Sequence, residues 1–431
     1  MADQTSKNSM TPGWYAEGLA HIWMPYAQMK TMSPPLPVVH THGSRIILAD
    51  GRELIDGIAS WWTACHGYNH PHIRRAVEAQ LGQMPHVMFG GFVHEQALTL
   101  ANRLTALLPG DLARVFFSES GSVAIEIAMK MALQYWINKG LRKKTKFMAF
   151  KHGYHGDTQG AMSVTDRNIG MHDVFHAAIP QHAVIDLGPE PVDDLAEVKT
   201  FFQRHATDYA GIIVEPLVQG AGGMVFRSEK LLRLLRQTAD SCEQILVFDE
   251  IFTGFGRTGT MFACEQAGVA PDIITLSKAL TGGTLPLAAT VATSEVFSAF
   301  WSDDPKKALM HGPTYMGNAL ACAAANASLD LFDREPRLRQ VADIARALEQ
   351  GLAPCRAIPR VKDVRVKGAI GVVEMDRIDD LDALRARFIE QGVFIRPIGN
   401  VIYLTPAFTI SYEELKTLTD VVVKTVRELK K

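Results

Sequence analysis

Length, composition and charge narrow the class of protein. The chain has 431 residues, of which 47% are hydrophobic and 21% are charged. These proportions are those of a globular protein and exclude a disordered chain, a collagen and a coiled-coil rod. Lys and Arg number 44 against 46 Asp and Glu, so charge gives no reason to expect a nucleic acid or a membrane as a partner.

Cysteine usage and hydropathy favour the cytoplasm. The five Cys form no Cys-x-x-Cys pair, which fits reduced thiols and not a disulfide framework. No run reaches the roughly 18 consecutive apolar residues of a membrane helix. Residues 1–13 lack the pattern of a signal peptide, so we expect a soluble cytoplasmic enzyme.

The first predicted elements form a strand pair near the amino terminus. The runs Ile46–Leu48 and Glu53–Asp56 flank the turn Asp50-Gly51, and a Gly in a short connection favours a hairpin.

Short apolar runs then alternate with helical patterns, among them the helices Val123–Asn138 and Glu229–Ser241. This alternation predicts an α/β fold with a mostly parallel, doubly wound sheet. Ligands of such sheets bind at the carboxyl ends of the strands. The predicted strands are Arg114–Ser118, Lys146–Phe150, Gly211–Glu215, Ile245–Phe248, Ile273–Leu276 and Ala288–Ala292.

The carboxyl-terminal part has a different pattern. Val364–Glu374 is strand-like, Leu381–Gln391 is helical, Val393–Arg396 and Val401–Leu404 suggest a strand pair, and Tyr412–Leu429 is an amphipathic helix. We predict a large domain over residues 70–330. A smaller α+β domain is expected from residues 1–69 and 331–431 together.

Two predicted strands end in residues suited to catalysis. Lys278 follows one strand and precedes Gly282-Gly283, and a Lys in such a desolvated place is a candidate Schiff-base amine. Asp249 ends another strand. Pyridoxal phosphate (PLP) needs a Lys for its aldehyde and an acid for its ring nitrogen. The alternatives are an exposed Lys at a strand end, and a helix cap or Mg²⁺ ligand for the Asp.

Two further segments could contact a phosphorylated cofactor. Small residues around Gly121 and Ser122 precede a long helix, whose first N–H groups can bind a phosphate. An ordinary Ser N-cap is the alternative. In the loop Lys151–Asp157, Tyr154 could stack on a planar ring, or it could be a partly buried turn residue.

The segment Gly254–Gly259 formally matches the dinucleotide pattern Gly-x-Gly-x-x-Gly. No helix of useful length follows before Pro271 and no acid closes a second strand, so a nicotinamide site is disfavoured. Arg257 is a better candidate for binding a carboxylate.

Histidines give no metal site. His66, His70 and His72 cluster around Pro71, but their spacing does not place two of them on one helix face, and Pro breaks a helix.

The ordered motifs resemble those of class III aminotransferases of PLP fold type I. The pattern consists of Asp249-Glu250, Gly254–Gly259, Pro271-Asp272 and Ser277–Gly283. Other segments resemble the branch of this family that acts in biotin synthesis, over residues 20–425. These are His21–Tyr26, Ser60–Trp62, His66–Pro71, His86–Gly91, Gly153–Thr158 and His311–Asn318.

The resemblance implies roles for the residues that match. Lys278 would form the Schiff base with PLP, Asp249 would contact the pyridine nitrogen and Tyr154 would stack on the ring; these are the expected catalytic residues. Gly121 and Ser122 would bind the phosphate.

Other implied contacts involve a second subunit and the substrates. Pro313 and Thr314 would reach the phosphate of the cofactor in the neighbouring subunit, so the resemblance implies a homodimer with shared active sites. The implied substrate contacts are Tyr26, Trp61, Tyr154, Arg257, Lys278, Gly312, Arg396 and Tyr403.

The reaction that this branch implies moves an amino group from S-adenosylmethionine, through PLP, to 8-amino-7-oxononanoate, giving 7,8-diaminononanoate. Lys278 would carry the proton. Ala319 stands where the family has Pro, and Ile398 where it has an aromatic residue. The second departure could alter the packing around the substrate chain.

Several alternatives stay open. They are a transaminase of ω-amino acids, a nicotinamide oxidoreductase and a PLP-binding protein without catalysis. Tyr26 with Trp61 argues against the first, and the pairing of Lys278 with Asp249 argues against the last. The amino donor itself is not fixed by any residue, and lysine could replace S-adenosylmethionine.

Overall fold

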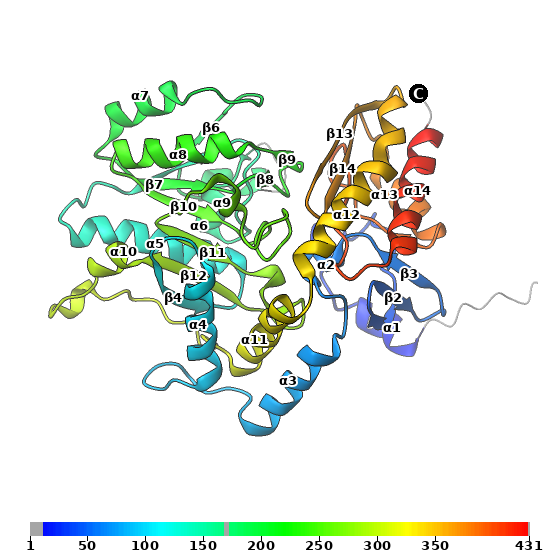
Figure 1. Ribbon diagram of the computed structural model, residues 1–431, viewed down its shortest axis with the longest axis horizontal. Coiled ribbons are helices and arrows are strands. Elements are labelled where there is room, and N and C mark those ends of the chain that lie inside the picture. The colour runs from blue at the N-terminus through cyan, green and yellow to red at the C-terminus, as the bar shows by residue number, and fades with distance from the viewer. Residues whose placement is uncertain (1–11, 168–171, 430–431) are drawn as a thin grey trace, which may run out of the picture.

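The computed structural model describes residues 12–167 and 172–429. The expectation that no signal peptide is present concerned residues 1–13. Of these, residues 1–11 lie outside the described residues. Figure 1 shows a central sheet with its helices, and beside it a lobe in which the amino-terminal segment (blue) and the carboxyl-terminal segment (orange to red) lie together.

The central sheet has seven strands in the order β4-β12-β11-β10-β7-β5-β6. All neighbouring pairs are parallel except the two that β12 makes, with β11 and with β4. The prediction of a mostly parallel sheet is therefore confirmed. The strands are β4 (Leu112–Ser118), β5 (Lys146–Phe150), β6 (Ala183–Ile185), β7 (Tyr209–Val214), β10 (Ile245–Asp249), β11 (Ile273–Leu276) and β12 (Ala288–Thr293).

Both faces of this sheet are buried under helices. Along β10, Leu246 and Phe248 belong to one core cluster, which also contains residues of α4, α7 and α8. Ile245 and Val247 belong to a second cluster with residues of α5, α6 and α10. Alternate side chains thus face opposite layers, as the pleat of a strand requires. The helices are α4 (Glu95–Leu107), α5 (Gly121–Asn138), α6 (Gln159–Ser163), α7 (Ala196–His205), α8 (Glu229–Ser241), α9 (Ala263–Ala267) and α10 (Ser294–Ser298).

Both ends of the described chain contribute to one small sheet, β1-β2-β3-β15, because β15 pairs in parallel with β3. A second sheet has the order β13-β14-β16. Their strands are β1 (Val38–His42), β2 (Arg45–Leu48), β3 (Glu53–Asp56), β13 (Val361–Lys367), β14 (Ile370–Met375), β15 (Val393–Phe394) and β16 (Val401–Leu404). The helices here are α1 (Gly13–Leu19), α12 (Arg337–Leu352), α13 (Leu381–Glu390) and α14 (Tyr412–Glu428).

Two predictions for this region are wrong. The single strand expected at Val364–Glu374 is a hairpin, because the chain reverses at Gly368, where φ is +54°. The pair expected between Val393–Arg396 and Val401–Leu404 does not form. The first pairs with β3 and the second with β14. A single bridge links Val401 to Ile398, which lies in the connection between the two segments.

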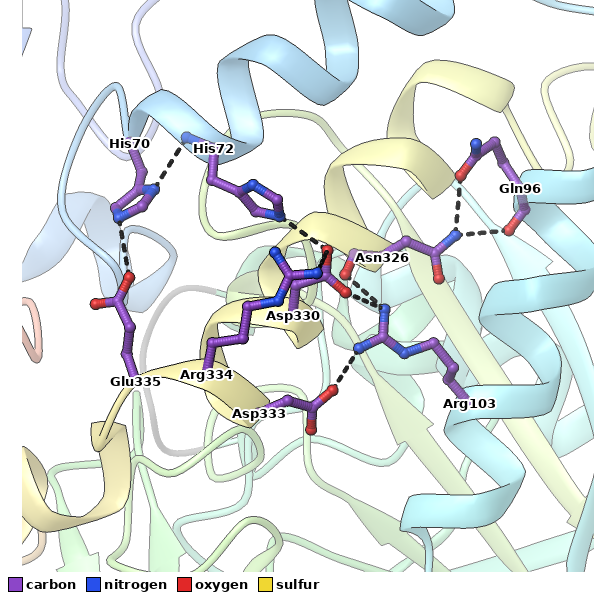
Figure 2. Close-up of polar contacts among 9 residues, drawn as sticks. All are labelled: His70, His72, Gln96, Arg103, Asn326, Asp330, Asp333, Arg334 and Glu335. Atoms are coloured by element: carbon purple, nitrogen blue, oxygen red, sulfur yellow. Dashed lines mark hydrogen bonds and ion pairs between the residues drawn. The ribbon is translucent and has the colours of Figure 1, made fainter.

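Polar side chains connect the helices below the central sheet, α3 (Pro71–Gln83), α4 and α11 (Ala319–Arg334) (Figure 2). Asp330 accepts a hydrogen bond from Arg103 at 2.8 Å and lies 2.8 Å from Nε2 of His72. Arg103 also contacts Asp333 at 2.8 Å. One carboxylate of α11 therefore ties together three helices.

Candidate active site

A cavity of about 460 Å³ opens at the carboxyl ends of β4, β5, β10 and β11. Its position is where an α/β sheet binds its ligand. It is lined by Trp62, Ser120, Gly121, Ser122, Tyr154, His155, Gly156, Asp157, Thr158, Glu215, Ala221, Asp249, Ile251, Phe252, Ser277 and Lys278.

Lys278 lies two residues after the end of β11 and lines this cavity. Its Nζ lies 5.0 Å from the centroid of the Trp62 ring. Burial lowers the pKa of Lys278 below its usual value, although the Asp249 and Glu215 carboxylates oppose the shift. A lowered pKa leaves more of the neutral, nucleophilic amine. The chain turns away after this Lys at Gly283, where a Cβ would lie 2.9 Å from the Ala64 backbone.

Asp249 ends β10 and is almost fully buried. One carboxylate oxygen accepts a hydrogen bond from the Ile251 N–H at 3.1 Å. The other lies 2.7 Å from Nδ1 of the buried His155. Burial alone would lower the pKa of His155, but the hydrogen bond to Asp249 and the nearby Glu215 charge raise it. These two contacts hold the Asp249 carboxylate in place, and one of them comes from His155, which can carry a positive charge.

Glu215 also lines the cavity, although sequence reasoning assigned it no role. Its carboxylate accepts hydrogen bonds from the N–H groups of Tyr154 and Gly220, each at 2.9 Å. Burial raises the pKa of Glu215 to about 7. The signal was present, because the predicted strand that ends at Glu215 delivers a carboxylate to the same sheet edge as Asp249.

The first turn of α5 faces the cavity. Ser120 caps the helix by accepting from the Val123 N–H at 3.4 Å. The N–H groups of Gly121 and Ser122 have no partner within the helix, and both residues line the cavity. The Ser122 hydroxyl accepts a hydrogen bond from the Thr158 N–H at 3.0 Å. Free N–H groups at a helix start form an anion site.

Tyrosine hydroxyls converge on Asp157 at the cavity wall. Tyr154 donates to its Oδ1 at 2.9 Å, and Tyr26 donates to its Oδ2. Burial and the Asp157 contact raise the pKa of Tyr26 to about 12. Tyr26 also packs edge-on against Trp61, with ring centroids 6.2 Å apart. The structure therefore brings together three residues predicted to be in the site, and adds Asp157.

A left-handed turn positions two tryptophans. All four residues of α2 (Ala59–Trp62) have positive φ, between 46° and 75°, and this conformation costs roughly 1–2 kcal/mol per residue without Gly. Asp56 stabilises it by accepting from the N–H groups of Ile58 and Ser60, both at 2.8 Å. Strain of this kind is characteristic of functional sites.

Arg396 and Tyr403 lie next to these tryptophans. The Arg396 guanidinium is 5.4 Å from the centroid of the Trp61 ring and has no ion-pair partner among the described residues. Tyr403 is fully buried, and within the described residues neither its hydroxyl nor Nε1 of Trp62 has a hydrogen-bond partner. Burial lowers the pKa of Arg396 and raises that of Tyr403. Unpaired donors of this kind are suited to a ligand carboxylate.

The predicted contact between Arg257 and a substrate stays a prediction, since one nitrogen of its guanidinium, Nη2, is buried and has no hydrogen-bond partner among the described residues. Its guanidinium is buried outside the cavity lining, and it donates to the backbone carbonyls of Ala369 at 3.2 Å and Pro406 at 2.8 Å. It also lies over the Phe408 ring, 4.6 Å from the centroid. Arg257 therefore joins the loop Gly254–Gly259 to the carboxyl-terminal lobe. The same loop is not followed by the long helix that a dinucleotide site requires.

Gly312, Pro313 and Thr314 do not line the cavity of their own chain. They lie in the irregular segment before α11, where Gly312 and Thr314 are exposed. Their expected role, which involves a second subunit, stays a prediction.

The residues present fit PLP. Lys278 offers an amine of lowered pKa, Asp249 a buried carboxylate held in place by His155, and the start of α5 two N–H groups for a phosphate. In the described parts of the chain, no group of three or more His, Cys, Asp or Glu side chains is arranged to hold a metal ion, and no helix is long and apolar enough to cross a membrane.

Comparisons with known proteins agree with this geometry. The family model of class-III aminotransferases matches residues 26–426. The chain therefore belongs to the class-III aminotransferase family, and it is a PLP-dependent aminotransferase with the fold type I architecture.

Individual relatives are more specific. The chain is 42% identical to the adenosylmethionine-8-amino-7-oxononanoate aminotransferase of Buchnera aphidicola subsp. Schizaphis graminum, over 94% of this chain and 95% of that protein. A crystal structure of the protein of that name from Methanocaldococcus jannaschii is 32% identical, with a TM-score of 0.90, and covers 96% of this chain and 98% of that one. A PLP-bound amine transaminase from an uncultivated Pseudomonas species is 31% identical, with a TM-score of 0.84, over 94% and 98% of the two chains.

Proposed function

We propose that this enzyme moves the amino group of S-adenosylmethionine to the ketone of 8-amino-7-oxononanoate, in biotin synthesis. The observation that carries the proposal is the unpaired Arg396, which lies over Trp61 beside a cavity that already contains Lys278 and Asp249. A keto acid with a distant carboxylate needs this combination of a reacting amine and a remote cation. The proteins named for this reaction, which match nearly the whole chain, support the proposal.

The residues of the cavity have separate tasks. When bound, PLP supplies an aldehyde that takes up the amino group and a ring that accepts electrons from the substrate carbon. The Asp249 carboxylate would keep the ring nitrogen protonated, and Tyr154 would cover the ring. The free N–H groups of Gly121 and Ser122 would bind the phosphate. Lys278, as a neutral amine, would take the proton from the substrate carbon and return it.

Substrate recognition would use the aromatic wall. Trp61 and Trp62 offer apolar surface to the carbon chain of the keto acid, and Arg396 offers a planar pair of donors to its carboxylate. The Tyr403 hydroxyl and the Trp62 indole N–H are buried and find no hydrogen-bond partner in the described parts of the chain. Each would gain a hydrogen bond when the substrate binds. Tyr26 would contact the reacting end, since its hydroxyl lies 3.3 Å from that of Tyr154.

A homodimer is part of the proposal. The segments 86–93 and 310–315 touch, because Tyr315 packs against His86 with ring centroids 4.5 Å apart. Both segments carry exposed apolar side chains, and exposed apolar surface favours an interface. It would bring Gly312, Pro313 and Thr314 to the partner's cavity. The exposed side chains are Met88, Phe92, Val93, Met310 and Tyr315.

The cytoplasm is the compartment that we propose. All five cysteines are unpaired, and four of them are buried. Unpaired thiols are typical of a reducing compartment.

A donor panel tests the reaction. We would mix the yellow holoenzyme with S-adenosylmethionine, lysine, ornithine or 4-aminobutyrate, and follow the loss of cofactor absorbance in a single turnover. S-adenosylmethionine should react fastest by at least tenfold. A faster reaction with an ω-amino acid would instead support the alternative of an ω-amino acid transaminase. Borohydride reduction of the holoenzyme should label a peptide that contains Lys278, and a label on another Lys would contradict its assignment.

A further inference from the structure

Tyr68 holds the carboxylate that shapes the left-handed turn of α2. Its hydroxyl donates to Oδ2 of Asp56 at 2.6 Å, and neither of these two side chains lines the cavity. The backbone of Tyr68 is itself fixed, because its N–H and its carbonyl both bond to Gly43, between β1 and β2. A hydroxyl that donates to a carboxylate at this distance forms a strong, charge-assisted hydrogen bond. Tyr68 therefore connects a small sheet to the turn that carries the two tryptophans.

Burial governs the protonation of this pair. Burial and the Asp56 charge raise the pKa of Tyr68, so the hydroxyl keeps its proton and acts as a donor. Burial also raises the pKa of Asp56, and the hydrogen bond from Tyr68 is the largest of the contacts that oppose this rise. The same carboxylate accepts from the N–H groups of Ile58 and Ser60. Loss of the Tyr68 hydroxyl would therefore weaken the acceptor that holds the turn.

The turn lies between the two groups that the proposed function assigns to the ends of the keto acid. The ring centroid of Trp62 is 5.0 Å from Nζ of Lys278, and that of Trp61 is 5.4 Å from the guanidinium of Arg396. Neighbouring residues thus contact the reacting amine and the remote cation. Their positive φ values, 51° and 75°, direct the two rings, so the conformation of the turn sets how the aromatic wall lies along the substrate chain.

The two tryptophans depend on the turn to different degrees. Trp62 is buried and packs against Phe252, with ring centroids 4.2 Å apart. Trp61 is 39% exposed, and its edge contact with Tyr26 is longer, at 6.2 Å. A run of positive φ without Gly is unfavourable and persists only where other contacts hold it. If the turn loosened, Trp61 would move more than Trp62, and the remote end of the site would change first.

We propose that Tyr68 is a positioning residue, which acts through Asp56 to fix Trp61, so that the site selects a keto acid whose carboxylate lies far from its ketone. This inference rests on the proposed function and deepens it, because it names the contact that selects the length of the acceptor. Tyr68 itself does not touch the substrate.

The test measures binding and not turnover. 7-Oxononanoate has the ketone and the carboxylate of the proposed acceptor but no amine, so it cannot condense with the aldehyde of PLP, and calorimetry with the yellow holoenzyme reports binding alone. 5-Oxoheptanoate has the same two groups but is two methylene groups shorter. The wild-type protein should bind the longer acid more tightly. Tyr68→Phe should weaken the binding of 7-oxononanoate about tenfold and that of 5-oxoheptanoate less than about threefold.

A double-mutant cycle tests whether Tyr68 acts through Asp56. Asp56→Asn removes one acceptor oxygen from the same contact, and it should also reduce the preference for the longer acid. The double variant should be no worse than the more affected single variant, because both changes break one interaction. Additive losses would mean that Tyr68 acts independently of Asp56, and they would overturn the inference.

Tyr135→Phe is the matched control. The Tyr135 hydroxyl also donates to a carboxylate, that of Glu295, at 3.0 Å, but it lies on α5 outside the lining of the active-site cavity. This variant should change neither binding constant. If Tyr68→Phe weakened both acids equally, or weakened neither, the inference would be overturned while the proposed function stood. A wild-type protein that does not bind 7-oxononanoate, or an Arg396→Ala protein that binds it unchanged, would contradict the proposed function and this inference with it.

Discussion

Arg396 shows what a single residue contributes to this account. Its guanidinium has no carboxylate partner in the described chain, it lies over Trp61, and burial lowers its pKa. A cation in this situation pays a desolvation cost that an incoming carboxylate would offset. It lies between β15 and β16 near the end of the chain, and only the structure shows that it lacks a partner.

Removal of Arg396 should separate the two substrates. Arg396→Ala should weaken the binding of the keto acid by about 2–5 kcal/mol, because a buried charge pair is lost. Arg396→Lys should recover little, since Lys lacks the planar pair of donors. The measurement is the apparent KM of each half-reaction in single turnovers. Arg377→Ala, at an exposed Arg, serves as the control. An effect confined to the donor half-reaction would mean that Arg396 binds the other substrate.

At the scale of elements, the left-handed turn of α2 is the most unusual local structure. Nothing in the sequence announces it, because Ala59–Trp62 contains no Gly. The turn is imposed by the packing of the tryptophans and by the Asp56 carboxylate, which accepts hydrogen bonds from the N–H groups of Ile58 and Ser60.

Ser60→Gly tests the strain. Gly adopts φ near +51° without steric cost, so this variant should raise the free energy of unfolding by about 1 kcal/mol, or leave it unchanged if the greater freedom of the unfolded chain offsets the gain. Chemical denaturation measures this free energy. The control is Ser241→Gly at the end of α8, which should lower the free energy of unfolding. A loss at position 60 of 1 kcal/mol or more would mean that the turn is not strained.

The polar contact between α3, α4 and α11 gives a pH-dependent prediction (Figure 2). Burial would raise the pKa of Asp330, but the hydrogen bonds from His72 and Arg103 lower it. A lowered carboxylate pKa stabilises the fold above the unfolded value near 4, and this contribution is lost as the pH falls through the folded value. Asp330→Asn should therefore lower the free energy of unfolding by about 1–2 kcal/mol at pH 7, and by less as the pH falls below 4.

Asp333→Asn is the matched control. It contacts the same Arg103, but its side chain is 64% exposed, so its loss should cost under about 1 kcal/mol. If both variants lost the same free energy of unfolding across the pH range, the position of Asp330 between the helices would add nothing to stability.

Sequence periodicity predicted elements better than it predicted their partners. The predicted bounds of β5 and β11 match the observed ones, because each is a short, largely buried run that is followed by a polar residue, Lys151 or Ser277. The hairpin at Gly368 was missed because apolar residues continue on both sides of the turn. The hydrogen bonds of Arg257 to the backbone of Ala369 and Pro406 were not predicted, because these acceptors are distant in sequence. The division of the chain at residues 69 and 330 remains a prediction.

For the whole molecule, the proposed dimer has the sharpest consequence. If Thr314 serves the cofactor of the partner subunit, a Lys278→Ala chain and a Thr314→Ala chain should form a heterodimer with one intact site. Activity should partly return after subunit exchange, towards one quarter of the wild-type value in an equal mixture. If tagged heterodimers form and no activity returns, Thr314 acts within its own chain or has no role in the site.

The product itself tests the central claim most directly. The purified holoenzyme would be incubated with 8-amino-7-oxononanoate and with S-adenosylmethionine that is isotopically labelled at its amino nitrogen, and the products would be analysed by mass spectrometry. We predict that 7,8-diaminononanoate forms and carries the label, and that the Lys278→Ala protein forms none. Unlabelled product, no product from the wild-type protein, or labelled product from Lys278→Ala would contradict the account.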